Sequence, residues 1–309
     1  MLTYNHQRFV AQAIESVMMQ ETNFDYELVI GEDCSTDRTS DICTSYQKKY
    51  PDKIRLLRRE RNLGLVQNFV QTFYNCKGKY IATISGDDYW TSPSKLQKQA
   101  NFLDNHSDYA MCFTPTMCFF EDKSRKPQYS PPPDCKRDTF TIEDLLRGNP
   151  IGACSVMFRN GLFDSFPDWF FSLRIEDWPL HILNAQHGKI GYINEAMAAY
   201  RIHPNSIYSS HSLVEKMLWD VDFYKVINVH LNFKYQPLIR EMLAQRHQSL
   251  AGEYLRTKDT ANARRYAIES IKNLPRKAYP LKGYIIIGSL MIFAKSIVLS
   301  RGMRKGNSQ

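Results

Sequence analysis

Residues 79–90 read KYIATISGDDYW. Most of the first six side chains favour β-strands, and the glycine and paired aspartates that follow favour a turn. The stretch therefore predicts a strand, Lys79–Ile84, that runs directly into a polar loop, Ser85–Trp90. A strand whose carboxyl end carries acids is the pattern from which the rest of the fold is predicted.

Two earlier segments show the same pattern. Met1–Tyr4 predicts the end of a strand followed by Asn5, and Tyr26–Ile30 predicts a strand that ends at Glu32-Asp33. Helical periodicity separates these strands, and such alternation is typical of β-α-β units on a mixed, largely parallel sheet flanked by helices. Ligands of open α/β sheets bind beyond the carboxyl ends of the strands, so we expect the three polar clusters to converge on one crevice.

The first strand has few residues before its turn. A strand of this kind normally has about five residues, and Met1–Thr3 supplies fewer. Either the start is truncated or the strand is short.

The remaining pattern predicts an α/β domain, residues 1–210, followed by a helical region, residues 211–309. Further strands are expected at 54–57, 110–120, 153–158, 190–193 and 197–202, with a loop over 121–137. Helices are expected at 9–17, 41–50, 64–74, 145–149 and 178–186, and one opens with Ser92 as N-cap and Pro93 at its first position. The later helices are expected at 213–229, 237–255, 261–274 and 283–299.

Charge is distributed unevenly along the 309 residues. The formal net charge is +8, but residues 234–309 alone carry +11 and residues 1–233 carry −3. The main domain therefore lacks the basic surface of a nucleic-acid-binding protein, and we expect no nucleic-acid partner. Seven cysteines without a C-x-x-C pair, and an N-terminus without the features of a signal peptide, predict a cytoplasmic protein.

The turn at Ser85–Asp88 has two interpretations. Paired carboxylates at a sheet edge suit a hard divalent cation, because substrate phosphates can complete its octahedron of oxygens. The alternative is an ordinary β-turn with a helix-capping acid. The polar clusters at Thr3 and Asp33 favour the first interpretation, since an acid there can accept from a nucleotide base and hydroxyls can reach ribose.

Five motifs in register resemble a family 2 glycosyltransferase with the GT-A fold, of the bacterial polysaccharide type. They are Leu2–His6, Glu32–Asp37, Asn62–Gly64, Gly86–Trp90 and Glu176–Trp178, and the resemblance covers about residues 1–205. It implies a nucleotide-diphosphate sugar donor, usually UDP-linked, with Mg²⁺ or Mn²⁺ as cofactor. It also implies inverting transfer of a hexosyl or N-acetylhexosaminyl group to a hydroxyl of a saccharide or lipid-linked saccharide.

The resemblance carries over to individual residues. Asp177 would be the general base, and Asp87, Asp88 and His203 would hold the metal. The nucleotide-sugar would be bound by Thr3, Tyr4, Asn5, Glu32, Asp33, Gly64, Ser85, Gly86 and Asp87. One departure is Ser85, which stands where the family usually has the first acid of its metal motif, so we expect weak metal binding without the donor.

Other interpretations remain open at this stage. Asp177 precedes a predicted helix and could simply be its N-cap. A nucleotidyltransferase would also use such a sheet, but it would be expected to have a Gly-rich basic loop, and Arg8 is the only base soon after Asn5. A membrane-associated module that binds a nucleotide-sugar without efficient turnover is the non-enzyme alternative.

The basic tail predicts a membrane contact. Residues 283–294 are uncharged, but this is shorter than the roughly 20 apolar residues that cross a bilayer. Basic residues flank the run and would face anionic headgroups; they are Arg276, Lys277, Lys282, Arg301, Arg304 and Lys305. We expect residues 276–305 to attach the protein peripherally to the inner membrane face, and the alternative is a basic helix packed on the catalytic domain.

Overall fold

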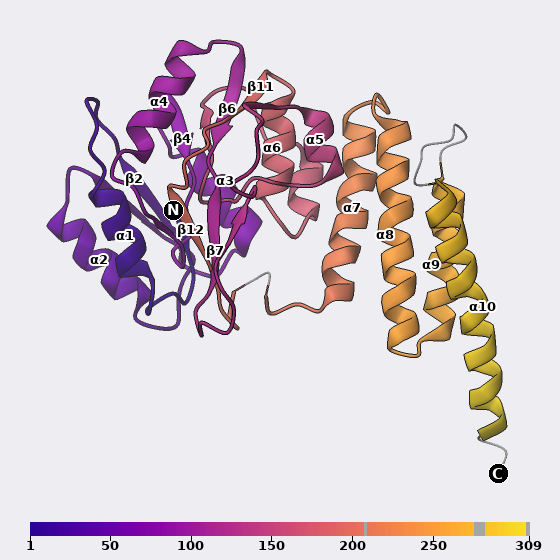
Figure 1. Ribbon diagram of the computed structural model, residues 1–309. Helices are drawn as coiled ribbons and strands as arrows, with labels where there is room; N and C mark the ends of the chain where they lie inside the picture. Colours follow the sequence, from indigo (N-terminus) through magenta and orange to yellow (C-terminus); the bar gives the residue numbers. More distant parts are fainter. Residues whose placement is uncertain (207–208, 275–281, 307–309) are drawn as a thin grey trace. The chain divides into compact units, whose positions relative to one another are not determined.

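The computed structural model describes residues 1–206, 209–274 and 282–306. The chain divides into two compact units, Met1–Ser209 and Ser210–Gln309 (Figure 1). Each unit has its own architecture.

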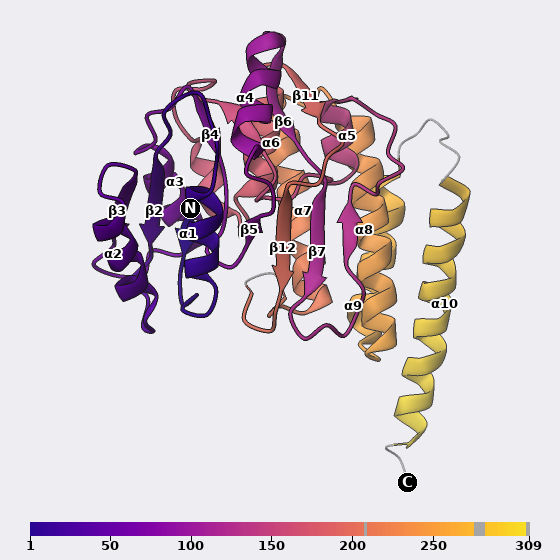
Figure 2. The same ribbon diagram turned by 60° about the vertical axis from the view of Figure 1, so that its left-hand side comes forward.

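The first unit begins with a parallel sheet in the order β1-β2-β3; β2 and β3 lie side by side in Figure 2. The strands are β1 (Leu2–Thr3), β2 (Leu28–Glu32) and β3 (Ile54–Arg58), and the helices between and after them are α1 (Val10–Met18), α2 (Thr39–Lys49) and α3 (Leu65–Phe73). All five residues of β2 are buried, as expected of a central parallel strand covered on both faces. The sequence prediction of alternating strands and helices is confirmed here.

The rest of this unit is a mixed sheet region. Five strands follow the order β4-β10-β6-β11-β9, and four follow the order β5-β12-β7-β8. Only β6 with β11 and β7 with β12 are parallel in these two groups. The strand bounds are β4 (Tyr80–Ala82), β5 (Tyr89–Trp90), β6 (Tyr109–Phe113), β7 (Thr116–Phe120), β8 (Gln128–Ser130), β9 (Thr139–Phe140), β10 (Met157–Arg159), β11 (Lys189–Tyr192) and β12 (Ala198–Ile202). The helices are α4 (Lys95–Asn105), α5 (Ile142–Arg147), the 3₁₀ helix η1 (Asp168–Ser172) and α6 (Asp177–Ala185).

The strand β1 joins the first sheet to the turn after β4. On one side it pairs with β2, and on the other the backbone N–H of Leu2 donates to the carbonyl of Ile84 at 3.2 Å. A bridge between Leu2 and Ser85 continues this pairing. The short first strand therefore brings the loops that follow β1, β2 and β4 to one edge.

Several predicted boundaries are wrong. The single strand expected over 110–120 is two strands, β6 and β7, because Pro115 between them lacks the N–H that a continuous strand would donate. The loop expected over 121–137 contains β8, which pairs with β7. The strand expected from Ala153 begins only at Met157, and the helix expected to open at Pro93 begins at Lys95 with Ser94 as its N-cap.

The second unit consists of helices in the part that the structure describes. They are α7 (Leu213–His230), α8 (Gln236–Arg256), α9 (Thr260–Asn273) and α10 (Lys282–Gly306). Fully buried small side chains, including Ala244, Ala251 and Ala263, let α8 and α9 approach closely. Among the described residues, no helix is long and apolar enough to cross a bilayer. Arg276 and Lys277 of the expected membrane segment lie outside the described residues.

Candidate active site

Three strand ends meet at one edge of the first unit. The backbone N–H of Asp33, after β2, donates to the carbonyl of Thr3 at 3.0 Å. The backbone N–H of Gly86, after β4, donates to the carbonyl of Leu2 at 2.7 Å. The polar clusters that the sequence predicted to converge are therefore joined directly through the backbone of β1.

The loop after β1 is tied to the loop after β2. Asn5 has a φ of 54°, and its backbone N–H donates to Ser35 Oγ at 3.0 Å. Its side-chain oxygen accepts from the backbone N–H of Thr36 at 2.8 Å. Asn5 thus holds the two loops together, whereas the neighbouring Tyr4 side chain is 40% exposed at the same edge.

The acids after β2 have different partners. Glu32 accepts from the backbone N–H of Ser35 at 2.7 Å and so closes its own turn. Asp33 accepts from the backbone N–H groups of Leu63 at 2.8 Å and Gly64 at 3.0 Å, one at each carboxylate oxygen. Burial raises the pKa of Asp33, although these two N–H groups act in the opposite direction. Each Asp33 oxygen retains acceptor capacity for a further donor.

Open space lies next to Asp33. Gly64 has a φ of +79°, and a β-carbon added there would meet nothing within 4 Å. Glycine adopts this backbone conformation without strain. The position therefore combines a turn that favours glycine with room for a ligand beside Asp33.

Two imidazoles face one carboxylate oxygen in the turn after β4. His203 Nε2 lies 3.1 Å from Asp87 Oδ2, and His6 Nε2 lies 3.6 Å from the same oxygen. Burial acts to raise the pKa of Asp87, but the hydrogen bond with His203 and the charges of both histidines outweigh it, so the pKa is lowered. Asp87 is therefore held as a carboxylate.

Gly86 makes this cluster compact. A β-carbon at Gly86 would lie 2.5 Å from Thr3 Oγ1 and 2.9 Å from His6 Nδ1. Any larger residue would push the loop after β1 away from the turn. Gly86 is thus required for the close approach of the loop after β1 to this turn.

Asp88 has a different environment from Asp87. One of its oxygens accepts from the backbone N–H of Arg201 at 2.9 Å, and the residue is 2% exposed. Burial, followed by the charge of Asp87, raises its pKa well above the usual value. Asp88 thus fastens β12 to the turn through one oxygen, whereas its other oxygen, Oδ2, is buried without a hydrogen-bond partner.

Asp177 is the first residue of α6, and Glu176 occupies the N-cap position without a side-chain cap bond. One Asp177 oxygen accepts from Asn149 Nδ2 at 3.3 Å. Burial raises the pKa of Asp177, and burial together with the charge of Asp177 raises that of Glu176 to about 8. The N-cap interpretation of Asp177 is therefore wrong, because the carboxylate belongs to a residue inside the helix.

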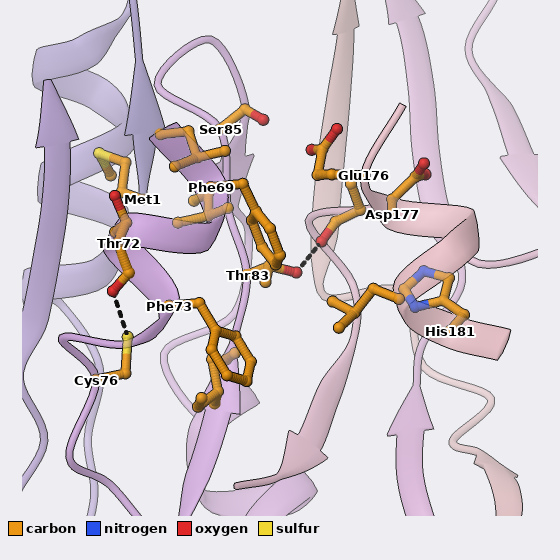
Figure 3. Close-up of a pocket in the computed structure, with 16 residues that line it drawn as sticks. Met1, Phe69, Thr72, Phe73, Cys76, Thr83, Ser85, Glu176, Asp177 and His181 are labelled. Atoms are coloured by element: carbon orange, nitrogen blue, oxygen red, sulfur yellow. Dashed lines mark hydrogen bonds between the residues drawn. The ribbon is translucent and has the colours of Figure 1, made fainter. Parts of the chain in front are cut away.

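A pocket lies between Ser85 and Asp177, which both line it (Figure 3). Its lining comes largely from α3, β4 and α6 and is mostly apolar, and it includes Phe69, Phe73 and Leu180. No Lys or Arg lines it. Ser85, Glu176 and Asp177 are the lining residues that belong to the candidate site.

Tyr200 on β12 is a residue near the acids that the sequence reasoning did not include among the site residues. Burial raises the pKa of its phenol, and the charges of Asp88, Asp87 and Asp177 raise it further. Tyr200 therefore lies within electrostatic reach of Asp87 and of Asp177. His6 was missed in the same way, although both residues lie inside recognisable motifs, because neither residue type is diagnostic by itself.

The donor set at Asp87 suits a divalent cation only in part. Within the described ranges, no three or more His, Cys, Asp or Glu side chains form a ready metal-binding group. The carboxylate and imidazole of Asp87 and His203 have the appropriate chemistry and spacing for two ligands. Further ligands would have to come from the substrate or from side-chain movement.

Comparison with known proteins identifies the fold and the family. The fold is that of GT-A glycosyltransferases. It is shared with S. aureus TarS 1–349 in complex with UDP-GlcNAc, at a TM-score of 0.63 and 18% identity over 99% of this chain and 90% of that one. It is also shared with the mannosyltransferase PcManGT from Pyrobaculum calidifontis in complex with GDP-Man and Mn²⁺, at a TM-score of 0.57 and 11% identity over 97% and 84%.

The profile described as "Glycosyl transferase family 2" matches residues 1–166, and the chain belongs to this family. An uncharacterized protein of Mycobacterium tuberculosis strain H37Rv, Rv1520, is 34% identical over 219 residues. The match covers 71% of this chain and 62% of that relative's length. The resemblance and the fold expected from the sequence are confirmed.

Proposed function

We propose that this chain is an inverting glycosyltransferase that moves a sugar from a nucleotide-diphosphate donor, UDP-linked, to a hydroxyl of a saccharide or lipid-linked saccharide. The observation that carries the proposal is the pairing of two acidic centres. Asp87 lies beside the imidazole of His203 in the turn after β4, and Asp177 lies across the pocket from Ser85. One centre suits a departing diphosphate, and the other suits an attacking hydroxyl.

The donor would occupy the edge formed by β1, β2 and the Ser85 turn. Asp33 would accept from a base N–H, with the open space beside Gly64 admitting the ring. Tyr4 is exposed at the same edge and offers an aromatic face for stacking. Thr3 and Ser85 would provide hydroxyls near the ribose. The UDP-GlcNAc complex of TarS supports a UDP-linked sugar.

Asp87 and His203 would hold a divalent cation, Mg²⁺ or Mn²⁺, against the diphosphate. When bound, such a cation stabilises the negative charge that develops on the leaving group. The Mn²⁺ complex of PcManGT supports the use of a divalent ion. Asp88 would be the weaker ligand of the two acids, because burial raises its pKa and one of its oxygens accepts from the backbone N–H of Arg201, although the other oxygen has no hydrogen-bond partner.

Asp177 would act as the general base. Its carboxylate takes the proton of the acceptor hydroxyl while the oxygen forms a bond to the anomeric carbon. The bond between that carbon and the diphosphate breaks, and the leaving group keeps the electron pair, so the configuration inverts. A base whose pKa is raised towards the working pH accepts a proton more readily, and burial raises the pKa of Asp177 in this sense.

A screen of UDP-, GDP- and dTDP-sugars for metal-dependent nucleotide release tests this proposal. We expect release with a UDP-sugar, and product with the opposite anomeric configuration when an acceptor is present. Donor binding without turnover for every sugar would instead favour a nucleotide-sugar-binding module. No binding of any nucleotide would remove the proposed function altogether.

The second unit would attach the protein peripherally to an anionic membrane surface, in keeping with a lipid-linked acceptor and surface polysaccharide assembly. On α10, Ile285 is 3% exposed and packs inward, whereas Ile287 and Met291 are 60% and 54% exposed. These two residues are four positions apart and share one helix face. An exposed apolar face on a basic helix suits the headgroup region of a membrane.

A further inference from the structure

We propose that His6 joins Asp87 and His203 in holding the divalent cation, and that this nitrogen-rich set makes the chain prefer Mn²⁺ or Co²⁺ to Mg²⁺. The inference rests on the proposed function, because the cation would be held together with the donor diphosphate. It concerns a residue and an ion preference that the family match does not assign.

The distances from Asp87 Oδ2 to the two imidazole nitrogens are close to the spacing of metal ligands. Neighbouring ligands on an octahedron with bonds of about 2.1 Å are about 3 Å apart. His203 Nε2 and Asp87 Oδ2 are 3.1 Å apart, which is already this spacing. His6 Nε2 is 3.6 Å from the same oxygen, so a shift of about half an ångström would bring this pair to the same spacing.

His6 is held in the way that metal-binding histidines are held. Its Nδ1 lies 3.3 Å from Thr3 Oγ1, and its backbone N–H donates to Thr39 Oγ1 at 2.8 Å. A hydrogen bond at one ring nitrogen fixes the ring orientation and leaves the other nitrogen for a metal. The ring nitrogen that remains, Nε2, is the one that faces Asp87.

The neighbouring acids explain why a second imidazole matters. Position 85 is a serine, and one oxygen of Asp88 accepts from the backbone N–H of Arg201, while its other oxygen has no hydrogen-bond partner. Asp87 is the acid of this turn whose ion-pair contacts are with His6 and His203. A cation beside Asp87 would therefore meet two imidazole nitrogens.

The ion preference follows from the ligand chemistry. Carboxylates and water suit Mg²⁺, whereas imidazole nitrogens favour first-row transition ions, whose affinity rises from Mn²⁺ to Co²⁺. His203 alone would already produce this order in part, so the change in ion preference when His6 is removed is the decisive quantity. A histidine that only positions Asp87 by hydrogen bonding would affect the binding of Mg²⁺ and Mn²⁺ alike.

Calorimetry on the full chain with UDP and each of Mg²⁺, Co²⁺ and Mn²⁺ tests the inference. We expect Mn²⁺ to bind at least about 10-fold more tightly than Mg²⁺, with Co²⁺ tighter still. His6→Ala should lower Mn²⁺ affinity about 10-fold or more and leave Mg²⁺ affinity nearly unchanged. His6→Asp should restore metal binding and shift the preference towards Mg²⁺. His187→Ala, which removes an exposed histidine of the same unit, is the matched control.

Pulsed electron paramagnetic resonance of the Mn²⁺–UDP complex gives a readout independent of activity. We expect nitrogen couplings from two imidazoles in the natural chain and from one in His6→Ala or His6→Gln, the second variant guarding against misfolding of the first. One imidazole in the natural chain, or unchanged Mn²⁺ affinity in folded His6→Ala, would overturn the inference while leaving UDP binding intact. Loss of all nucleotide binding by the natural chain would instead count against the proposed function as well.

Discussion

His203 Nε2 lies 3.1 Å from Asp87 Oδ2, although 116 residues separate the two along the chain. His203 follows β12, and Asp87 follows β4. Pairing of β12 with β5, through Ala198 and Trp90, carries the histidine to the turn. The contact is thus produced by the strand pairing of the first unit rather than by local sequence.

The two adjacent aspartates should respond differently to loss of charge. Asp87→Asn should reduce the affinity for UDP in the presence of Mn²⁺ at least about 10-fold, because its pKa is lowered and the charged form is used. Asp88→Asn should change it little, because a raised pKa already favours the neutral form that asparagine resembles. Calorimetry of both variants makes the comparison. Equal losses in the two would contradict the separate roles.

Gly86→Ala should destabilise the first unit. The added methyl group would lie 2.5 Å from Thr3 Oγ1, and overpacking of this kind typically costs about 1–3 kcal/mol. Thermal unfolding should therefore occur at a lower temperature than in the natural chain. Gly148→Ala is the matched control, because a β-carbon there meets nothing within 4 Å. A melting temperature for Gly86→Ala equal to that of Gly148→Ala would show that the turn can move away freely.

Glu176 should make stability depend on pH. Its pKa is about 8 in the folded chain, against an ordinary value of 4.5. Between these values the unfolded chain has lost a proton that the folded chain keeps, so stability falls as pH rises from about 4.5 to about 8. Glu176→Gln should therefore raise the melting temperature more at pH 8 than at pH 5. Glu21→Gln, at an exposed position, should show no such difference, and an equal gain at both pH values for Glu176→Gln would refute the raised pKa.

The exposed face of α10 should govern membrane binding. Replacing Ile287 and Met291 together by Gln should reduce flotation with vesicles that contain anionic lipid, because both side chains are more than half exposed. Val229→Gln is the control, since Val229 is 61% exposed on α7 of the same unit. Flotation of the double variant equal to that of the control would rule out this face as the contact.

The sequence was sufficient to predict the order of strands and helices in the first unit. Helical periodicity predicted α1 and α3, because their buried residues recur on one face. A run of apolar residues predicted β2. The convergence of the loops after β1, β2 and β4 also followed, because parallel strands end at one edge. These features depend on residue types that are close in sequence.

The different roles of the site residues could not be predicted from the sequence. Asp87 and Asp88 are the same residue type in adjacent positions, and contacts that are distant in sequence distinguish them. Asp88 accepts from the backbone N–H of Arg201, 113 residues away, whereas Asp87 faces His203 and His6. The role proposed for His6 depends on its contact with Asp87, which residue types and their spacing do not predict. Short strands such as β5 and β8 were also missed, because their pairing partners rather than their own residues define them.

The role of Asp177 is tested most directly by the rate of sugar transfer in Asp177→Asn, measured beside the affinity of the same variant for the donor. We predict unchanged donor affinity, because Asp177 lies across the pocket from Ser85 and the proposed donor site. We also predict a rate of transfer lowered at least about 10²-fold, because the acceptor hydroxyl loses its base. A variant that transfers sugar at the rate of the natural chain would contradict the assignment of Asp177 and, with it, the proposed mechanism.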